Sequence, residues 1–367
     1  MTATLQNWRE PQHTAWGFQN VDQLIPTQPI KRSLTPFDLP TSEPHSFEGF
    51  TVRNLDFKSF LNYTSTDGFV LLHKGKIIHE YYANTNNVDS KHIIFSMTKS
   101  MTALVAGILN HQGTLDLTAD VKKYIPEVSK LYDGVTVQQC LDMETGVKYE
   151  DGQHEYRAAT AWEPLGSSDK YKTLHEFLQH VDAEMDEGKG FNYCSVNTDL
   201  LGWVIERATK RKLSQLISEL LWEPMGASSD AFITVDSEGS PRAAGGMSAT
   251  VRDLARVGQL LVDGGRDVVP KSWIEEMLNG GNIAKFAKGL WFGAFGAFEK
   301  PAYHNCWVTD PDTRRLVALG IHGQQLVVDL DHEIVMAKTS SQLTPVEFDK
   351  SVLGFEAMGE FRRLLAG

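Results

Sequence analysis

The chain has 367 residues, and 41% of them are hydrophobic, which is enough for a sizeable core and argues against a disordered protein. Its 35 Lys and Arg are outnumbered by 47 Asp and Glu, giving a net charge of −12, and no basic run resembles a phosphate-binding surface. We therefore expect no nucleic-acid partner.

The N-terminal residues 1–32 show no basic start followed by an apolar core, and no long apolar run occurs later in the chain. The sequence therefore predicts neither a signal peptide nor a membrane span, which favours a cytoplasmic protein. Cys140, Cys194 and Cys306 form an odd, scattered trio, so we expect reduced thiols rather than a disulfide framework. Such thiols usually serve as small buried hydrophobes.

Residues 1–50 contain six prolines, which interrupt regular elements repeatedly and predict an extended arm lying on the body of the protein. Within residues 68–82, two apolar, β-prone runs flank Lys74-Gly75-Lys76. This pattern predicts a hairpin at an edge of the main sheet.

Downstream of the hairpin the pattern becomes mainly helical. A helix that begins near Ser96 and ends before Gly113 is followed by amphipathic runs over residues 198–210 and 251–262. Asn197 is the predicted N-cap of the first of these two runs.

β-prone runs return after Gly289 and predict successive antiparallel strands over residues 291–298, 303–309, 315–320, 325–329 and 333–339. An amphipathic helix over residues 346–365 closes the chain. This order predicts an α/β (α+β) fold in which residues 51–95 and 285–367 form an antiparallel sheet with flanking helices, while residues 96–284 form a large helical insertion. We expect one catalytic unit, with its site between the two regions.

The first chemical signal is the stretch Phe-Ser-Met-Thr-Lys-Ser at residues 95–100. Three residues are close to one helical turn, so the Lys99 ammonium is expected beside the Ser96 hydroxyl at the start of a helix. A lysine held in an apolar wall can accept the serine proton near neutral pH, which would make Ser96 a nucleophile without histidine. Ser-x-x-Lys also occurs by chance, and a serine at a helix start often serves only as a cap.

A second stretch, Phe-Asn-Tyr-Cys-Ser-Val-Asn at residues 191–197, stands directly before a predicted helix. A lysine cation and a helix N-terminus nearby would both favour the phenolate of Tyr193, which makes this residue a candidate base for Ser96. The alternative is that Tyr193 packs and donates one hydrogen bond, the commoner fate of a tyrosine.

The third stretch, Ala-Leu-Gly-Ile-His-Gly-Gln at residues 318–324, ends a predicted strand, and its small residues allow close approach of the backbone. Acyl transfer needs two donors aimed at the developing oxyanion, and we expect the backbone N–H groups of Ser96 and Ile321 to supply them. His322 would then lie near the substrate, the alternative being a hydrogen-bonded histidine at a strand end.

These stretches, in this order, resemble the serine β-lactamase and penicillin-recognising superfamily, where Ser-x-x-Lys, a Tyr-x-Asn or Tyr-x-Ser element and a Lys-Thr-Gly-like strand form the site. The resemblance covers most of residues 60–342 and implies catalytic roles for Ser96, Lys99 and Tyr193. Within the class C β-lactamase and esterase branch, the stretches are most similar to the 6-aminohexanoate-dimer (nylon oligomer) hydrolases, which cleave linear amides and simple esters. The resemblance implies a serine hydrolase that forms an acyl-enzyme and uses neither metal nor organic cofactor.

No lysine stands in the Lys-Thr-Gly position of the third stretch, so a β-lactam carboxylate would lose its usual cationic partner. This departure favours a small-molecule amide or carboxylic ester as the substrate. A carboxylesterase, a β-lactamase or DD-peptidase-like enzyme, and a non-catalytic binding protein of the same fold are the alternatives. The sequence leaves the oligomeric state open, a homodimer included.

Other chemistries find little support in the sequence. His175, Glu176 and His180 superficially resemble the zinc-protease motif His-Glu-x-x-His, but five residues turn a helix by about 500°, which leaves the two imidazoles ~140° apart. We therefore expect no metal site there. No Gly-x-Ser-x-Gly elbow or phosphate-binding glycine motif occurs, and nothing in the sequence pairs Cys194 with a histidine.

Residues 145–169 show no clear period and predict an irregular loop of the kind that often lines a site. An elongated apolar pocket could be walled by four aromatic residues, Tyr156, Trp162, Trp291 and Trp307. We select Tyr156, Trp307 and His322 as substrate-contacting residues, with ordinary core packing as the alternative for the aromatic ones.

Overall fold

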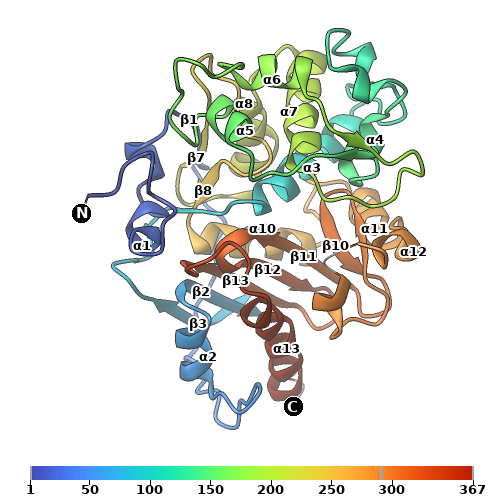
Figure 1. The fold of residues 1–367 in the computed structure, drawn as a ribbon. Helices are drawn as coiled ribbons and strands as arrows, with labels where there is room; N and C mark the ends of the chain where they lie inside the picture. The colour runs from blue at the N-terminus through green and yellow to red at the C-terminus, as the bar shows by residue number, and fades with distance from the viewer. Residues whose placement is uncertain (1, 290–291, 366–367) are drawn as a thin grey trace.

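The computed structural model describes residues 2–289 and 292–365, and its centre is a seven-stranded antiparallel sheet of order β3-β2-β13-β12-β11-β10-β9 (Figure 1). The strands are β2 (Thr66–His73), β3 (Lys76–Tyr82), β9 (Ala302–His304), β10 (Trp307–Asp310), β11 (Arg315–Gly320), β12 (Gln324–Asp329) and β13 (Ile334–Ser340). Strand β2 pairs with both β3 and β13, so the sheet is assembled from both ends of the chain, as predicted.

Thirteen α-helices are found among the described residues. They are α1 (Thr14–Gly17), α2 (Phe57–Tyr63), α3 (Met97–His111), α4 (Val137–Leu141), α5 (His154–Ala159), α6 (Leu174–His180), α7 (Ser195–Thr209), α8 (Leu213–Ile217), α9 (Glu223–Met225), α10 (Val251–Val262), α11 (Lys271–Asn279), α12 (Ile283–Phe286) and α13 (Phe348–Leu365). None of the described helices is long and apolar enough to cross a membrane.

Helices α10 and α13 cover opposite faces of the large sheet. Gly258 of α10 packs against Val335, whereas Gly354 of α13 packs against Gln325. Gln325 lies opposite Lys338 in the strand register, and Lys338 is three residues beyond Val335. Because neighbouring residues of a strand point to opposite faces, the two helices lie on different sides of the sheet.

A smaller sheet of order β1-β7-β8-β4 joins the N-terminal segment to the middle of the chain. Its strands are β1 (Thr27–Ile30), β4 (His92–Ile93), β7 (Ala231–Thr234) and β8 (Met247–Ala249), and a further pair is formed by β5 (Val147–Lys148) and β6 (Glu184–Met185). The region predicted as helical therefore also contains short strands.

Two predicted strands differ from the structure. The segment 303–309 forms two strands, β9 and β10, because Asn305 and Cys306 have φ values of 50° and 60° and make a tight turn between them. The described residues of segment 291–298 form no strand. Phe292–Phe295 make a 3-10 turn instead, and the ring of Phe295 packs against Phe286 and Phe355.

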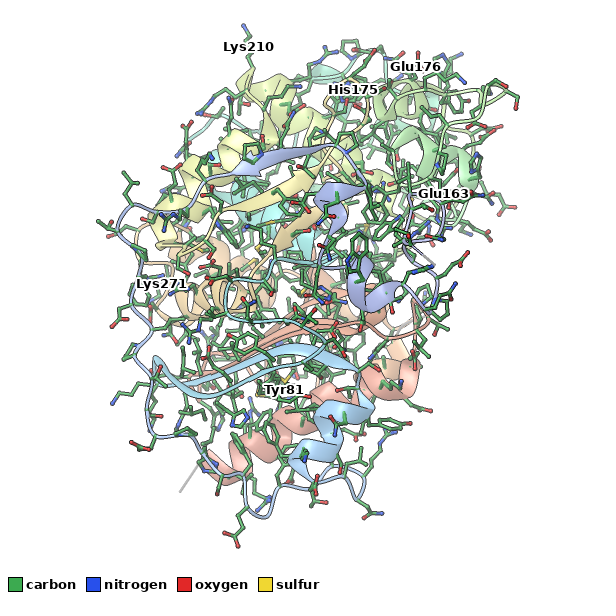
Figure 2. All side chains as sticks on the ribbon, turned by 90° about the vertical axis from the view of Figure 1, so that its left-hand side faces the viewer. Tyr81, Glu163, His175, Glu176, Lys210 and Lys271 are labelled. Carbon is green, nitrogen blue, oxygen red and sulfur yellow. The ribbon has the colours of Figure 1, made fainter. Side chains whose placement is uncertain are left out.

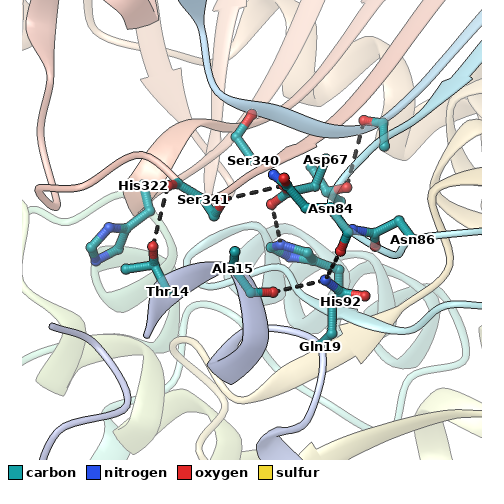
Figure 3. A network of polar contacts seen from close by, with 12 residues as sticks. Thr14, Ala15, Gln19, Asp67, Asn84, Asn86, His92, His322, Ser340 and Ser341 are labelled. Carbon is teal, nitrogen blue, oxygen red and sulfur yellow. Dashed lines mark hydrogen bonds and ion pairs between the residues drawn. The ribbon is translucent and has the colours of Figure 1, made fainter. Parts of the chain in front are cut away.

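The N-terminal segment is held against the large sheet, where β2 begins and β13 ends, by the polar contacts drawn in Figure 3. Thr14 donates a hydrogen bond to the carbonyl of Ser341, and Gln19 donates one to the carbonyl of Asn84. The buried carboxylate of Asp67 accepts from the side chains of both Asn84 and Ser341, at 2.6 and 3.1 Å. The segment therefore has a defined position against the body of the protein.

Candidate active site

Ser96 is the N-cap residue of α3, and the residue before it has an unusual backbone. Phe95 has a φ of 45°, in the left-handed region that bulky residues rarely adopt. Its buried ring packs between Trp8, Phe18 and Trp162, with centroid distances of 4.9 to 6.3 Å. Such backbone strain persists where surrounding packing enforces it, and it concentrates at functional sites.

Lys99 lies one helical turn beyond Ser96, and its side chain is buried. The Nζ atom donates to Ser96 Oγ at 3.0 Å, to Ser195 Oγ at 2.9 Å and to the carbonyl of Ala244 at 2.8 Å. These three acceptors match the three N–H groups of an ammonium. The structure thus brings together the serine and the lysine of the first stretch.

Tyr193 of the second stretch lies in the same place. The Nζ atom of Lys99 is 4.9 Å from the centroid of the Tyr193 ring, a distance at which a cation is attracted to the face of an aromatic ring. Ser96 and Tyr193 line one cavity. The three predicted catalytic side chains therefore come from two distant parts of the chain and meet at one site.

Ser195 is a site residue that the prediction did not assign, although it is the third member of the Tyr-x-Ser element. Its hydroxyl accepts from Lys99, and its backbone N–H donates to Asp151 Oδ1 at 2.9 Å at the start of α7. The prediction of Asn197 as the N-cap is wrong, because Cys194 holds that position. Asn197 lies inside the first turn, where its buried Oδ1 accepts from Tyr132.

A buried carboxylate, Asp199, holds the backbone that carries one of the Lys99 acceptors. Its Oδ1 accepts from the amide of Ala244 at 2.7 Å, and its Oδ2 accepts from Tyr156 at 2.6 Å and from the guanidinium of Arg242. Burial raises the pKa of the Tyr156 hydroxyl well above its ordinary value, so this group stays a donor. Tyr156 therefore helps to position Asp199, which in turn holds the backbone of Ala244.

The end of β11 lies unusually close to the backbone before Ser96. A Cβ atom at Gly320 would be 2.4 Å from Ile94 O, so only glycine permits this approach. It places Ile321 at the wall of the cavity that Ser96 lines. Within the described part of the chain, neither the amide of Ser96 nor that of Ile321 donates a hydrogen bond.

The turn at Ile321–Gly323 is stabilised by a hydrogen bond from Lys338, a buried lysine of β13. Lys338 Nζ donates to the carbonyl of Gly323 at 2.8 Å and to Ser340 Oγ at 2.6 Å. Burial lowers the pKa of Lys338 from its ordinary 10.5 to about 7. In the same turn, Gln324 Nε2 donates to the carbonyl of Ser340 at 2.7 Å.

The cavity beside Ser96 has a volume of about 450 Å³. Much of its wall is aromatic, with contributions from Trp162, Phe191, Phe286, Phe295, Tyr303, Phe348 and Phe355. Charged side chains also line it, namely Arg9, Glu150, Asp151, Arg157 and Arg242. The site can therefore accept an apolar chain that carries a polar or charged group.

Three predicted substrate contacts are not among the residues lining this cavity. Tyr156 belongs to the Asp199 network, and Trp307 is fully buried in the core of the sheet region. His322 turns away from the cavity, and its Nδ1 lies 2.6 Å from the carbonyl oxygen of Gln342. Burial lowers the pKa of His322 to about 4, so its ring is neutral at pH 7. Trp162 does line the cavity, whereas Trp291 lies outside the described residues.

Other reactive side chains do not form a second centre. No group of three or more His, Cys, Asp and Glu that could hold a metal ion occurs among the described residues. His175 and Glu176 lie on α6, in the outer part of the helical region (Figure 2), and the imidazole of His175 stacks on Trp203 with centroids 4.1 Å apart. Burial raises the pKa of Cys194 to about 12, so its thiol stays protonated.

The chain also matches known proteins. Residues 64–357 match the family described as Beta-lactamase. Over 358 residues the chain is 33% identical to the 6-aminohexanoate-dimer hydrolase of Paenarthrobacter ureafaciens, which covers 93% of this chain and 89% of that protein. Esterase EstB of Burkholderia gladioli is 30% identical over 158 residues, 39% of this chain and 38% of the esterase.

A similar solved structure is that of a Bacillus anthracis protein described as a candidate 6-aminohexanoate-dimer hydrolase. It has a TM-score of 0.88 and 25% sequence identity, and the match covers 98% of this chain and 97% of the other. The family match and the matches to the Paenarthrobacter ureafaciens and Bacillus anthracis proteins extend over the stretches that hold Ser96, Lys99 and Tyr193. The chain therefore belongs to the beta-lactamase family of serine hydrolases.

Proposed function

We propose that the protein cleaves a linear amide or a carboxylic ester through an acyl-enzyme formed on Ser96. One observation carries this proposal. The buried Nζ of Lys99 is hydrogen-bonded to both Ser96 Oγ and Ser195 Oγ while it lies against the ring of Tyr193. A serine and an amine in hydrogen-bond contact, with the ring of a tyrosine against the amine, supply the groups that serine activation without histidine requires.

In the proposed reaction, Ser96 Oγ attacks the substrate carbonyl carbon while Tyr193, acting with Lys99, removes the hydroxyl proton. The C–O bond to Ser96 forms and the carbonyl oxygen becomes an oxyanion. As this intermediate collapses, the same pair returns the proton to the leaving amine or alcohol. Water, deprotonated by Tyr193 with Lys99, then attacks the acyl-enzyme and releases the acid and the free Ser96 hydroxyl.

The backbone N–H groups of Ser96 and Ile321 are the proposed donors to the oxyanion. Both residues line the cavity, and neither amide donates to another residue in the described part of the chain. The close approach of Gly320 to Ile94 O fixes the spacing between the two backbones. Fixed donors of this kind stabilise the transition state because they need no reorganisation as charge develops.

A linear amide such as the 6-aminohexanoate dimer is the substrate class that the similarity favours, because the match to that hydrolase extends over most of both chains. A carboxylic ester is the second candidate, supported by the shorter match to esterase EstB. A β-lactam is less favoured, since the third stretch has no lysine to pair with its carboxylate. The cytoplasmic location stays a prediction.

Labelling with a serine-directed p-nitrophenyl phosphonate tests the nucleophile. We expect one phosphonate per chain, mapped to Ser96, and no label on Ser96→Ala, whose turnover should fall by at least about 10³-fold with an unchanged thermal unfolding midpoint. Ser237→Ala, an exposed serine, is the matched control and should label like the wild type. Near-native kcat for Ser96→Ala would refute the assignment.

A substrate panel then ranks the activities. The 6-aminohexanoate dimer, p-nitrophenyl esters of increasing chain length and nitrocefin should be compared by kcat/KM. Turnover of the amide or the esters well above that of nitrocefin is expected. Fast nitrocefin hydrolysis would overturn the substrate ranking, and an inert protein that still binds these compounds would support a non-catalytic binding role.

A further inference from the structure

The N-terminal segment supplies a charged residue to the wall of the catalytic cavity. Arg9 lines the cavity although it lies almost 90 residues before Ser96. Its guanidinium is held against two indole rings, with its carbon 5.4 Å from the Trp8 centroid and 5.9 Å from that of Trp162. The ring of Trp8 is itself buried beside Phe95, so the segment that carries Arg9 is anchored directly behind the nucleophile.

A second guanidinium, that of Arg157 from α5, lies beside Arg9 in the same cavity wall. Both groups donate to one oxygen, Oε1 of Glu163, at 2.9 and 3.1 Å. Figure 2 labels Glu163, and its other oxygen lies 2.7 Å from His154 Nδ1. Two arginines and a histidine thus converge on one carboxylate.

Most of the donor capacity of this arginine pair is unused. A guanidinium has five N–H groups, and within the described residues Arg9 and Arg157 each donate one hydrogen bond, to Glu163. Burial and the neighbouring charge of Arg157 lower the pKa of Arg9 to about 10. Placing like charges together in a partly buried wall is unfavourable, and such arrangements are typical of sites that bind a ligand of opposite charge.

The remaining charges of the wall have partners or lie elsewhere in it. Arg242 is paired with the buried Asp199, so its charge is balanced. The carboxylate of Asp151 accepts a hydrogen bond from the backbone N–H of Ser195, and Glu150 precedes Asp151 in the same segment. The arginine pair is therefore the part of the cavity wall with cationic donors to spare.

We propose that Arg9 and Arg157 form an anion subsite, which binds a carboxylate carried by the substrate away from its scissile bond. The planar fork of each guanidinium matches a carboxylate and can form two parallel hydrogen bonds with it. The substrates are then linear amides or esters with a free terminal carboxylate. This inference rests on the hydrolase activity proposed for Ser96 and narrows its substrate class.

Two esters that differ only in one charge test the subsite. Mono-p-nitrophenyl adipate carries a terminal carboxylate, and its methyl ester is the neutral counterpart with the same chain and leaving group. We expect wild-type kcat/KM to favour the anionic ester by about tenfold, a ratio that added salt lowers. The net charge of −12 would by itself repel this ester, so a preference for it points to a local cationic site.

Arg9→Gln should lower the ratio of anionic to neutral kcat/KM by about tenfold, and Arg157→Gln should lower it in the same direction. Arg53→Gln is the matched control, because this exposed arginine pairs with Glu356 on α13 and should keep the wild-type ratio. A ratio near one in the wild type, or an unchanged ratio in both cavity variants, would overturn the subsite. A ratio that falls in Arg53→Gln as well would also overturn it.

The ratio of anionic to neutral kcat/KM tests the anion subsite, whereas the activity of Ser96→Ala tests the proposed nucleophile, so the two proposals can fail independently. If Ser96 is not the nucleophile, Ser96→Ala will still hydrolyse both esters, whatever their ratio. If only the anion subsite is absent, Ser96→Ala will be inactive and the wild type will hydrolyse the two esters equally well. Turnover of the neutral ester by each arginine variant shows that the variant is folded.

Discussion

The close approach of β11 to the backbone before Ser96 makes Gly320→Ala a direct test of the oxyanion assignment. A Cβ at this position would lie 2.4 Å from Ile94 O, whereas such contacts are essentially never shorter than 3.0 Å, so the two backbones must separate by at least about 0.6 Å. Ile94 stands two residues before Ser96, and Ile321 directly follows Gly320. The separation therefore moves the two proposed donors apart.

Misplacing reacting groups by about 1 Å can cost about 10²-fold in rate, and removing one oxyanion donor costs about 10² to 10³-fold. We expect Gly320→Ala to lower kcat for a p-nitrophenyl ester by about 10²-fold. The KM should change less, because these donors act mainly on the transition state. Overpacking should also lower the free energy of unfolding by about 1–3 kcal/mol, measured by urea denaturation.

Gly359→Ala supplies the matched control for this substitution. Gly359 is exposed on α13, and a Cβ there would meet nothing within 4 Å. The control should keep the wild-type kcat and gain about 0.5–1 kcal/mol in stability, because alanine favours a helix interior over glycine. If Gly320→Ala folds and keeps the wild-type kcat, the reasoning that ties this strand end to the oxyanion is refuted.

Two further substitutions test the proton carrier and the lowered pKa of the buried Lys338. Tyr193→Phe keeps the ring but removes the hydroxyl, so kcat should fall by about 10²-fold or more, and a mild loss in steady-state kinetics would assign the base to Lys99 alone. Burial lowers the pKa of Lys338 from 10.5 to about 7, so between these two pH values the unfolded chain binds more protons than the folded one. The free energy of unfolding of the wild type therefore rises with pH in this window. Lys338→Met lacks this rise, so the urea midpoint of the variant minus that of the wild type should be higher near pH 7 than near pH 10. The same difference at both pH values would contradict the pKa shift.

Elements with strong local signals are predicted with their observed bounds. The sequence predicts α10 at residues 251–262 and β11 at residues 315–320, and the structure has the same limits. Thr250 caps helix α10, because its hydroxyl oxygen accepts a hydrogen bond from the backbone N–H of Asp253, and this cap can be recognised from the local sequence. The small sheet has no such signal, because its strands have two to four residues and β1 pairs with β7 about 200 residues away.

In the site, too, local spacing predicts contacts between residues close in sequence, whereas it does not predict contacts between residues far apart in sequence. The spacing of the first stretch predicts the contact between Ser96 and Lys99 because a helical turn enforces it. Residue type alone does not tell which of two neighbours faces a cavity: Ile321 lines it, whereas His322, with a φ of 60°, turns its ring into the protein. The role of Arg9 is equally hidden, since its partner Glu163 lies 154 positions away.

The two buried lysines near the site differ in the number of acceptors around them, and this difference bears on the mechanism. Lys99 Nζ has three acceptors, one for each N–H of an ammonium. Lys338 Nζ has two within the described part of the chain, which match a neutral amine. An ammonium that donates three hydrogen bonds has no lone pair with which to accept the Ser96 proton. We therefore propose Tyr193 as the acceptor, with Lys99 stabilising the negative charge that proton transfer moves between the two oxygens.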